Sequence, residues 1–172
     1  MESRNFICGG TKFIYSKGYI GLPVMLDNLP DAVFVQGETL QKKSSFHVSL
    51  LCVKDILANN PDSEQDVMET FCAFVADQDI SFIRYMGEFR FVQHEERKTL
   101  VALCEVSNLS EFSSVLGKKL KMEIPLQPTH VTLYTLQPDI GIGLNSSVDM
   151  EQKSTSVETP EPLKVAFGIS QG

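Results

Sequence analysis

Two of the three histidines lie in the same four-residue pattern. His47 begins the tetrapeptide His-Val-Ser-Leu, and His130 begins His-Val-Thr-Leu in the other half of the chain. Side chains of a strand alternate between its two faces, so each histidine shares a face with the hydroxyl two positions on, about 7 Å along the strand. If the two strands lie side by side, Ser49 and Thr132 join both imidazoles on one polar surface.

Two imidazoles and two hydroxyls suit in-line displacement at phosphorus. One imidazole can accept a proton from an attacking water while the other donates to the leaving oxygen, because imidazole titrates near neutral pH. The hydroxyls can donate hydrogen bonds to the non-bridging oxygens as charge develops there. A single histidine in a strand is more often a surface or packed residue, but the repeated pattern favours the catalytic interpretation. The third histidine, His94, lies in the run His-Glu-Glu-Arg-Lys and is interpreted as a solvated turn residue.

The motifs at His47 and His130 resemble the paired His-x-Ser/Thr-x signature of the 2H phosphoesterase superfamily. That superfamily includes 2′-5′ RNA ligase-like proteins, cyclic nucleotide phosphodiesterases and RNA 3′-end trimming exonucleases. The resemblance implies an α+β, bilobal fold with two antiparallel sheets and flanking helices around a central groove. It also implies that His130 is the base that activates water and that His47 is the acid.

The expected activity is hydrolysis of a small phosphodiester without a metal ion or cofactor. The substrate would be a 2′,3′-cyclic phosphate, a 2′-5′-linked nucleotide or a cyclic nucleotide. The alternatives are RNA 3′-end processing or 2′-5′ RNA ligation, and a non-catalytic module that binds a nucleotide. A net charge of −7 argues against an extended grip on nucleic acid, so the expected partner is a small nucleotide or oligonucleotide.

Three further residues are candidates for substrate binding. Tyr134 shares the expected strand face of His130 and could stack on a base, or pack at the edge of the groove. Arg84 and Tyr85 come from a neighbouring strand and could reach the phosphate or sugar, although a solvated strand residue is an alternative for Arg84. The run Lys42-Lys43-Ser44-Ser45 could supply positive charge near the groove, but a solvated turn is the preferred interpretation.

The order of elements predicts one α+β domain over residues 1–144. The expected strands are Arg4–Cys8, Lys12–Tyr15, Tyr19–Met25, Ala32–Gln36, Ser45–Val53, Ser81–Val92, Lys98–Ser107 and Thr129–Leu136. Two or three helices are expected. One begins near Ser63 with an apolar stripe, with Asp62 and Ser63 as candidates for its cap, and another covers Ser110–Leu120. Residues 145–172 are rich in Ser, Thr, Glu and Pro and predict a flexible, polar tail, in which the apolar patch Val165–Ile169 could dock back as a strand.

Location and redox state are expected to be those of a cytoplasmic protein. The first residues do not form a secretory signal, and no stretch is apolar enough to span a bilayer. The four cysteines are far apart in the sequence and lack metal-ligand spacing, which favours buried free thiols in a reducing compartment.

Overall fold

The computed structural model describes residues 3–169 and has the predicted α+β architecture. Its strands form a single ten-stranded sheet. In chain order the elements are β1 (Arg4–Cys8), β2 (Thr11–Ser16), β3 (Tyr19–Val24), β4 (Ala32–Val35), β5 (Glu38–Lys42), β6 (Phe46–Cys52), α1 (Val53–Asn59), α2 (Glu64–Asp77), β7 (Phe82–His94), β8 (Arg97–Val106), α3 (Leu109–Leu120), β9 (His130–Thr135), α4 (Ser147–Lys153), β10 (Ser154–Val157) and α5 (Glu161–Lys164).

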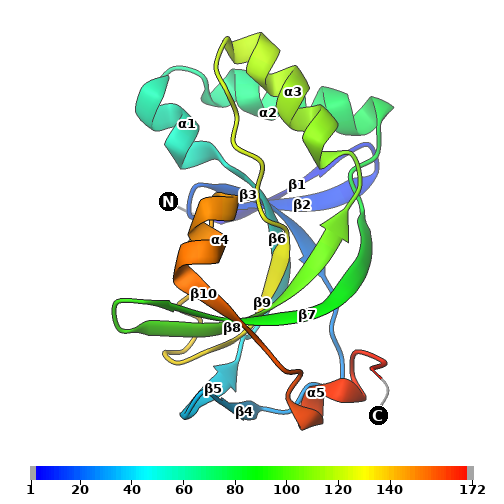
Figure 1. Cartoon of the computed structure of the whole chain (residues 1–172). Coiled ribbons are helices and arrows are strands. Elements are labelled where there is room, and N and C mark those ends of the chain that lie inside the picture. Colours follow the sequence, from blue (N-terminus) through cyan, green and yellow to red (C-terminus); the bar gives the residue numbers. More distant parts are fainter. Residues whose placement is uncertain (1–2, 170–172) are drawn as a thin grey trace.

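The sheet contains two matching three-stranded units. β2 and β3 form a hairpin and β3 pairs with β6, while β7 and β8 form a hairpin and β8 pairs with β9. β6 and β9 pair with each other, which gives the order β1-β2-β3-β6-β9-β8-β7-β10 (Figure 1). All these pairs are antiparallel, as predicted. The expectation of two sheets is wrong, because the contact between β6 and β9 joins both units into one sheet.

The main core lies on one face of the sheet, which we call the main-core face. Phe71 of α2 is at its centre, with ring centroids 4.8 Å from Phe13 and 5.2 Å from Phe112. Figure 1 shows α2 and α3 together at the top of the molecule, where they contact each other. The predicted apolar stripe of α2 is confirmed as buried: Val67, Phe71, Phe74 and Val75. The predicted cap at Ser63 does not form, because its hydroxyl donates to the Asn60 carbonyl instead.

A second, smaller cluster covers part of the opposite face, which we call the α4 face. Its members are Val92, Val101, Ile142, Leu144 and Met150. β8 separates the two clusters by strand alternation: Leu100, Ala102 and Cys104 belong to the main core, while Val101 and Leu103 pack on the second cluster. The side on which any residue of β9 lies can therefore be read from its partner in β8.

The prediction of a flexible tail is wrong for residues 145–169. The segment forms α4, β10 and α5, and β10 pairs with β7 from Ser154 opposite Val92 to Val157 opposite Phe89. Two of its apolar side chains pack on the rest of the domain: Leu163 is fully buried, and Phe167 contacts the rings of Tyr85 and Phe89. A polar composition hides this docking, since backbone hydrogen bonds to an edge strand need no apolar side chain.

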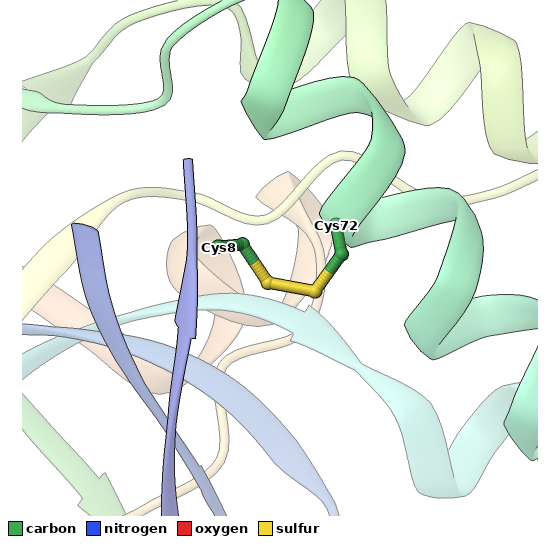
Figure 2. Close-up of a disulfide and its surroundings, with 2 residues drawn as sticks. All are labelled: Cys8 and Cys72. Carbon is green, nitrogen blue, oxygen red and sulfur yellow. A yellow bond between two sulfur atoms is a disulfide. The ribbon is translucent and has the colours of Figure 1, made fainter. Parts of the chain in front are cut away.

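The cysteines behave in two ways. Cys8 of β1 and Cys72 of α2 form a disulfide with their Cα atoms 5.0 Å apart (Figure 2), so the expectation of free thiols is wrong for this pair. Cys52 and Cys104 are free and buried, as expected. The disulfide joins the edge of the sheet to the helix that covers it, although the two cysteines are 64 residues apart.

Two short elements of the first half were not predicted, namely β5 and α1. β5 reads as a turn because of its charged and polar side chains, yet it pairs with the end of β9 through Gln41 and Lys42. Within the part of the chain that the structure describes, no helix is long and apolar enough to cross a bilayer.

Candidate active site

The two histidine motifs lie on adjacent strands at the junction of the two units. β6 and β9 are antiparallel, with Val48 opposite Val131. One step along this register in either direction places His47 opposite Thr132 and Ser49 opposite His130. Each imidazole therefore neighbours the hydroxyl of the other motif. The histidines are diagonal neighbours across the pair, a relation that separates such residues by about 7–8 Å.

All four side chains project from the α4 face of the sheet. Leu103 of β8 is opposite His130, and Val101 is opposite Thr132. Both β8 residues belong to the α4 face, and residues directly opposite each other in a sheet share a face. The central valines point the other way and are fully buried in the main core. The structure thus brings His47, His130, Ser49 and Thr132 together.

Both motifs end in a β-bulge at the leucine in their fourth position. In β6, Ser49 pairs with Gly21 but Leu51 pairs with Ile20, so Leu50 is the extra residue. In β9, Thr132 pairs with Val101 but Tyr134 pairs with Leu100, which makes the leucine between them the extra one. A bulge reverses the side-chain phase of the residues beyond it. The two leucines point into the main core, and each strand presents its histidine and hydroxyl on the α4 face before the bulge.

His130 is buried and its ring orientation is fixed. Its Nδ1 lies 2.6 Å from the carbonyl oxygen of Pro128. A carbonyl oxygen only accepts hydrogen bonds, so Nδ1 carries the hydrogen and Nε2 of the neutral ring keeps its lone pair. Burial lowers the pKa of His130, and the bond to Pro128 partly opposes that effect. The neutral ring is thus set to accept a proton at Nε2.

His47 is half-buried and packs against the backbone of β3. A Cβ added to Gly21 would lie 3.1 Å from its Cδ2 atom and 3.1 Å from Cγ1 of Ile14. Desolvation lowers the pKa of His47 to about 4, with Lys43, His130 and Lys17 adding to the effect. In the ligand-free protein this imidazole is therefore neutral at neutral pH.

Lys43 is a site residue that the sequence interpretation considered but did not select. It is half-buried, and its charge lowers the pKa of both His47 and His130. Burial lowers the pKa of Lys43 itself, while the Asp139 carboxylate raises it. Its backbone N–H donates to the Leu133 carbonyl, which holds the segment before β6 against β9. A sequence signal exists, because Lys43 precedes the first motif by four residues, but a turn of two lysines and two serines reads as solvated.

Asp139 anchors the segment that carries Lys43. Its carboxylate accepts hydrogen bonds from the Ser44 backbone N–H at 2.9 Å and from the Ser44 hydroxyl at 3.0 Å. These bonds lower the pKa of Asp139, which is exposed. At the other end of β6, Tyr19 donates to Asn145 at 2.8 Å. The segment from 139 to 145 is thus fastened near both ends of β6, beside the α4 face.

Ser49 and Thr132 keep free hydroxyls. Both residues are half-buried, and no side-chain hydrogen bond within residues 3–169 uses either hydroxyl. By contrast, the neighbouring Thr129 hydroxyl is engaged with the Cys104 carbonyl at 2.6 Å. The hydroxyls of the two motifs therefore remain able to donate to a ligand on the α4 face.

The interpretation of Tyr134 as a base-stacking residue is wrong. Tyr134 is fully buried in the main core, and its hydroxyl donates to the Pro30 carbonyl at 2.7 Å. The bulge at Leu133 is the cause, because it turns Tyr134 away from the face of His130. Simple alternation along the sequence places it on the wrong side.

Arg84 and Tyr85 lie on β7, two strands away from β9, or about 10 Å across the sheet. Arg84 is exposed and its Nε lies 2.9 Å from a carboxylate oxygen of Glu105. The Tyr85 ring packs in the main core against Phe82 and Phe167, and burial raises its pKa to about 12. The structure does not bring either residue to the histidine pair.

His94 lies in the turn region as predicted. It ends β7, is exposed, and its Nε2 is 4.0 Å from a Glu95 carboxylate oxygen. Over residues 3–169, no group of three or more His, Cys, Asp or Glu side chains is arranged to hold a metal ion.

Comparisons with models of known protein families, with curated proteins and with solved structures find no match for this chain. The chemistry of the site is therefore inferred from its own residues. Two imidazoles, two hydroxyls and an ammonium group beside one surface can move protons and bind an oxyanion.

Proposed function

We propose that this chain hydrolyses a small phosphodiester by metal-independent acid–base catalysis, as a divergent 2H phosphoesterase. One observation carries the proposal: the register of β6 and β9 sets each histidine beside the hydroxyl of the other motif. A phosphate over this junction meets two imidazoles and two hydroxyl donors. In the proposed family, the two three-stranded units would correspond to the two lobes.

His130 is the proposed base and His47 the proposed acid. Nε2 of His130 takes a proton from water as the water oxygen bonds to phosphorus, and the bond to the leaving oxygen breaks. Protonated His47 gives its proton to that leaving oxygen. The fixed tautomer of His130 supports this order, since its only free ring nitrogen is an acceptor.

His47 needs a proton before it can act as an acid. Its pKa of about 4 in the ligand-free protein leaves it neutral at neutral pH. A bound phosphodiester brings a negative charge to the ring, and an opposite charge raises an imidazole pKa. His47 therefore gains its proton with the substrate, while the Lys43 ammonium and the two hydroxyls stabilise the charge that grows on the non-bridging oxygens.

Replacement of either histidine tests the proposal. His47→Ala and His130→Ala are each expected to lower kcat/KM by about 10²–10⁴-fold, the usual contribution of one acid–base group. His94→Ala is the matched control, because His94 is exposed and remote from the junction of β6 and β9. Turnover is followed by phosphorus NMR on 2′,3′-cyclic nucleotides, 2′-5′ dinucleotides and cyclic nucleotides, with and without a chelator.

The outcomes separate the alternatives. Full activity in either alanine variant, or activity lost with the chelator, contradicts the proposal. Nucleotide binding with no product after long incubation indicates a non-catalytic binding module. Much faster turnover of an RNA oligomer ending in a 2′,3′-cyclic phosphate than of the mononucleotide indicates RNA end processing.

A further inference from the structure

A cavity of about 490 Å³ is lined in part by residues 126–129, which directly precede His130. Its walls come from β7, β8, the start of α3, residues 126–129 and α4. The volume is in the range that holds a small organic ligand. Most of the lining is apolar, including Met86, Leu103 and Met150. Thioethers of this kind pack well against aromatic rings.

Gln127 gives this cavity an unused polar group. The residue lines the cavity and is only 6% exposed. Its Oε1 is buried and has no hydrogen-bond partner within residues 3–169. Buried polar atoms in folded proteins almost always have a partner. A turn of the Gln127 side chain toward the cavity would let this orphan oxygen accept from a ligand that supplies an N–H or O–H donor.

Three residues of the cavity wall are neighbours of His130 in the chain or in the sheet. Pro128 and Thr129 line it, and the Pro128 carbonyl holds the His130 ring. Leu103, another wall residue, is directly opposite His130 in the sheet. Gln127 is three residues from His130, at most about 10 Å along the chain. One molecule can therefore touch both the histidine pair and the cavity.

Charge decides which part of that molecule enters. The cavity lining includes Glu105, whose carboxylate pairs with Arg84, and Gln127, whose side-chain oxygen is an acceptor. Within residues 3–169 no lysine or arginine lines the cavity, whereas the charges of Lys43 and Lys17 act on His47. A phosphate is thus favoured at the histidines, and a neutral, donor-bearing ring is favoured beside Gln127.

We propose that this cavity binds the nucleobase of the substrate, and that Gln127 accepts a hydrogen bond from an exocyclic amino group of the base. The inference rests on the proposed function for the position of the phosphate. Adenine and cytosine carry such an amino donor, whereas a phosphodiester without a base leaves Gln127 unpartnered. The protein then discriminates nucleotides from other small phosphodiesters through Gln127.

Binding of adenosine 5′-monophosphate and of ribose 5-phosphate, measured by calorimetry, tests the inference without requiring turnover. We expect the wild type to prefer the nucleotide, and Gln127→Met to reduce that preference by about tenfold, the effect of one neutral hydrogen bond. Thr135→Val is the matched control, because it removes another buried, unpartnered oxygen that lies outside the cavity. Met86→Trp fills the cavity from an exposed position and should also reduce the preference, even if Gln127→Met folds poorly.

The results distinguish this inference from the proposed function. If phosphodiesters are hydrolysed but both cavity variants keep the wild-type preference for the nucleotide, the cavity is not the base site and the proposed function stands. If no phosphodiester is hydrolysed but the cavity variants weaken binding of the nucleotide alone, the base site stands and the hydrolase proposal fails. Equal affinity of the wild type for both ligands overturns the inference.

Discussion

His47 and His130 occupy equivalent positions in two matching three-stranded units, but their rings are held by different means. His130 is buried and bonded to a backbone carbonyl two residues before it. His47 is half-buried and packs against Gly21, and the charge of Lys43 lowers its pKa. The same tetrapeptide pattern therefore yields one oriented acceptor and one ring whose protonation depends on nearby charge. The flanking residues make this difference, because the motifs themselves are almost identical.

This asymmetry suits a reaction that needs one base and one acid. The carbonyl of Pro128 leaves Nε2 as the only acceptor on the His130 ring. The charges of both Lys43 and Lys17 act on His47, so an anion is favoured beside that ring. In the proposed mechanism, these unequal surroundings would distinguish the base from the acid without a second type of catalytic residue.

Gly21→Val should produce the largest effect confined to the His47 side. The new side chain would press on the His47 ring and on Ile14, since even a Cβ would lie 3.1 Å from each. We expect the displacement of the His47 ring to lower kcat by about 10²-fold. The thermal midpoint should change little. Gly141→Val is the matched control, because nothing lies within 4 Å of its added Cβ. Equal activity of both variants would show that the position of His47 is unimportant.

Lys43→Met should alter the pKa of both histidines. Removal of its charge raises the pKa of His47 above its value of about 4 and also raises the pKa of His130. We expect kcat/KM to fall by about tenfold, because one charged donor is lost. NMR titration of the imidazole protons measures both pKa values. Lys42→Met, at an exposed position paired with Asp31, should leave them unchanged; a shift there instead would remove Lys43 from the site.

Thr135→Val should have the smallest effect, a change in stability alone. It compares β9 with β6 at the equivalent positions beyond their bulges. Thr135 is fully buried and its hydroxyl has no partner among residues 3–169, whereas the equivalent Cys52 accepts a weak bond from Asn145 at 3.6 Å. Removal of the orphan hydroxyl is expected to raise the free energy of unfolding by about 1 kcal/mol. Denaturant titration measures the change. Cys52→Val should give no such gain, and a gain at Cys52 alone would contradict this reasoning.

Much of the fold is predictable because strand patterns are local. The strands that carry both motifs, the hairpin of β7 and β8, and the stripe of α2 all follow from the periodic placement of apolar residues. The same alternation predicts that His47 and Ser49 share one face, as do His130 and Thr132. The sequence did not predict which face the residues beyond each motif occupy, because a bulge carries no reliable sequence signal. The bulge at Leu133 turns Tyr134 into the core.

Other features depended on partners far away in the sequence. Residues 145–169 are ordered because β7 offers β10 an unpaired edge, which the composition of this segment does not reveal. The disulfide exists because β1 packs under α2. Lys43 became a site residue because Asp139 and the Leu133 carbonyl hold its segment beside β9.

The sequence by itself determined which chemical groups each strand presents, because side-chain alternation needs only neighbouring residues. Only the tertiary structure decided that β6 lies beside β9 with Val48 opposite Val131, which brings the two halves of the site together. That register arises from the packing of both units and their bulges across the whole sheet, and no short segment contains it. The cavity beside Gln127 has the same origin, since its walls come from five separate parts of the chain.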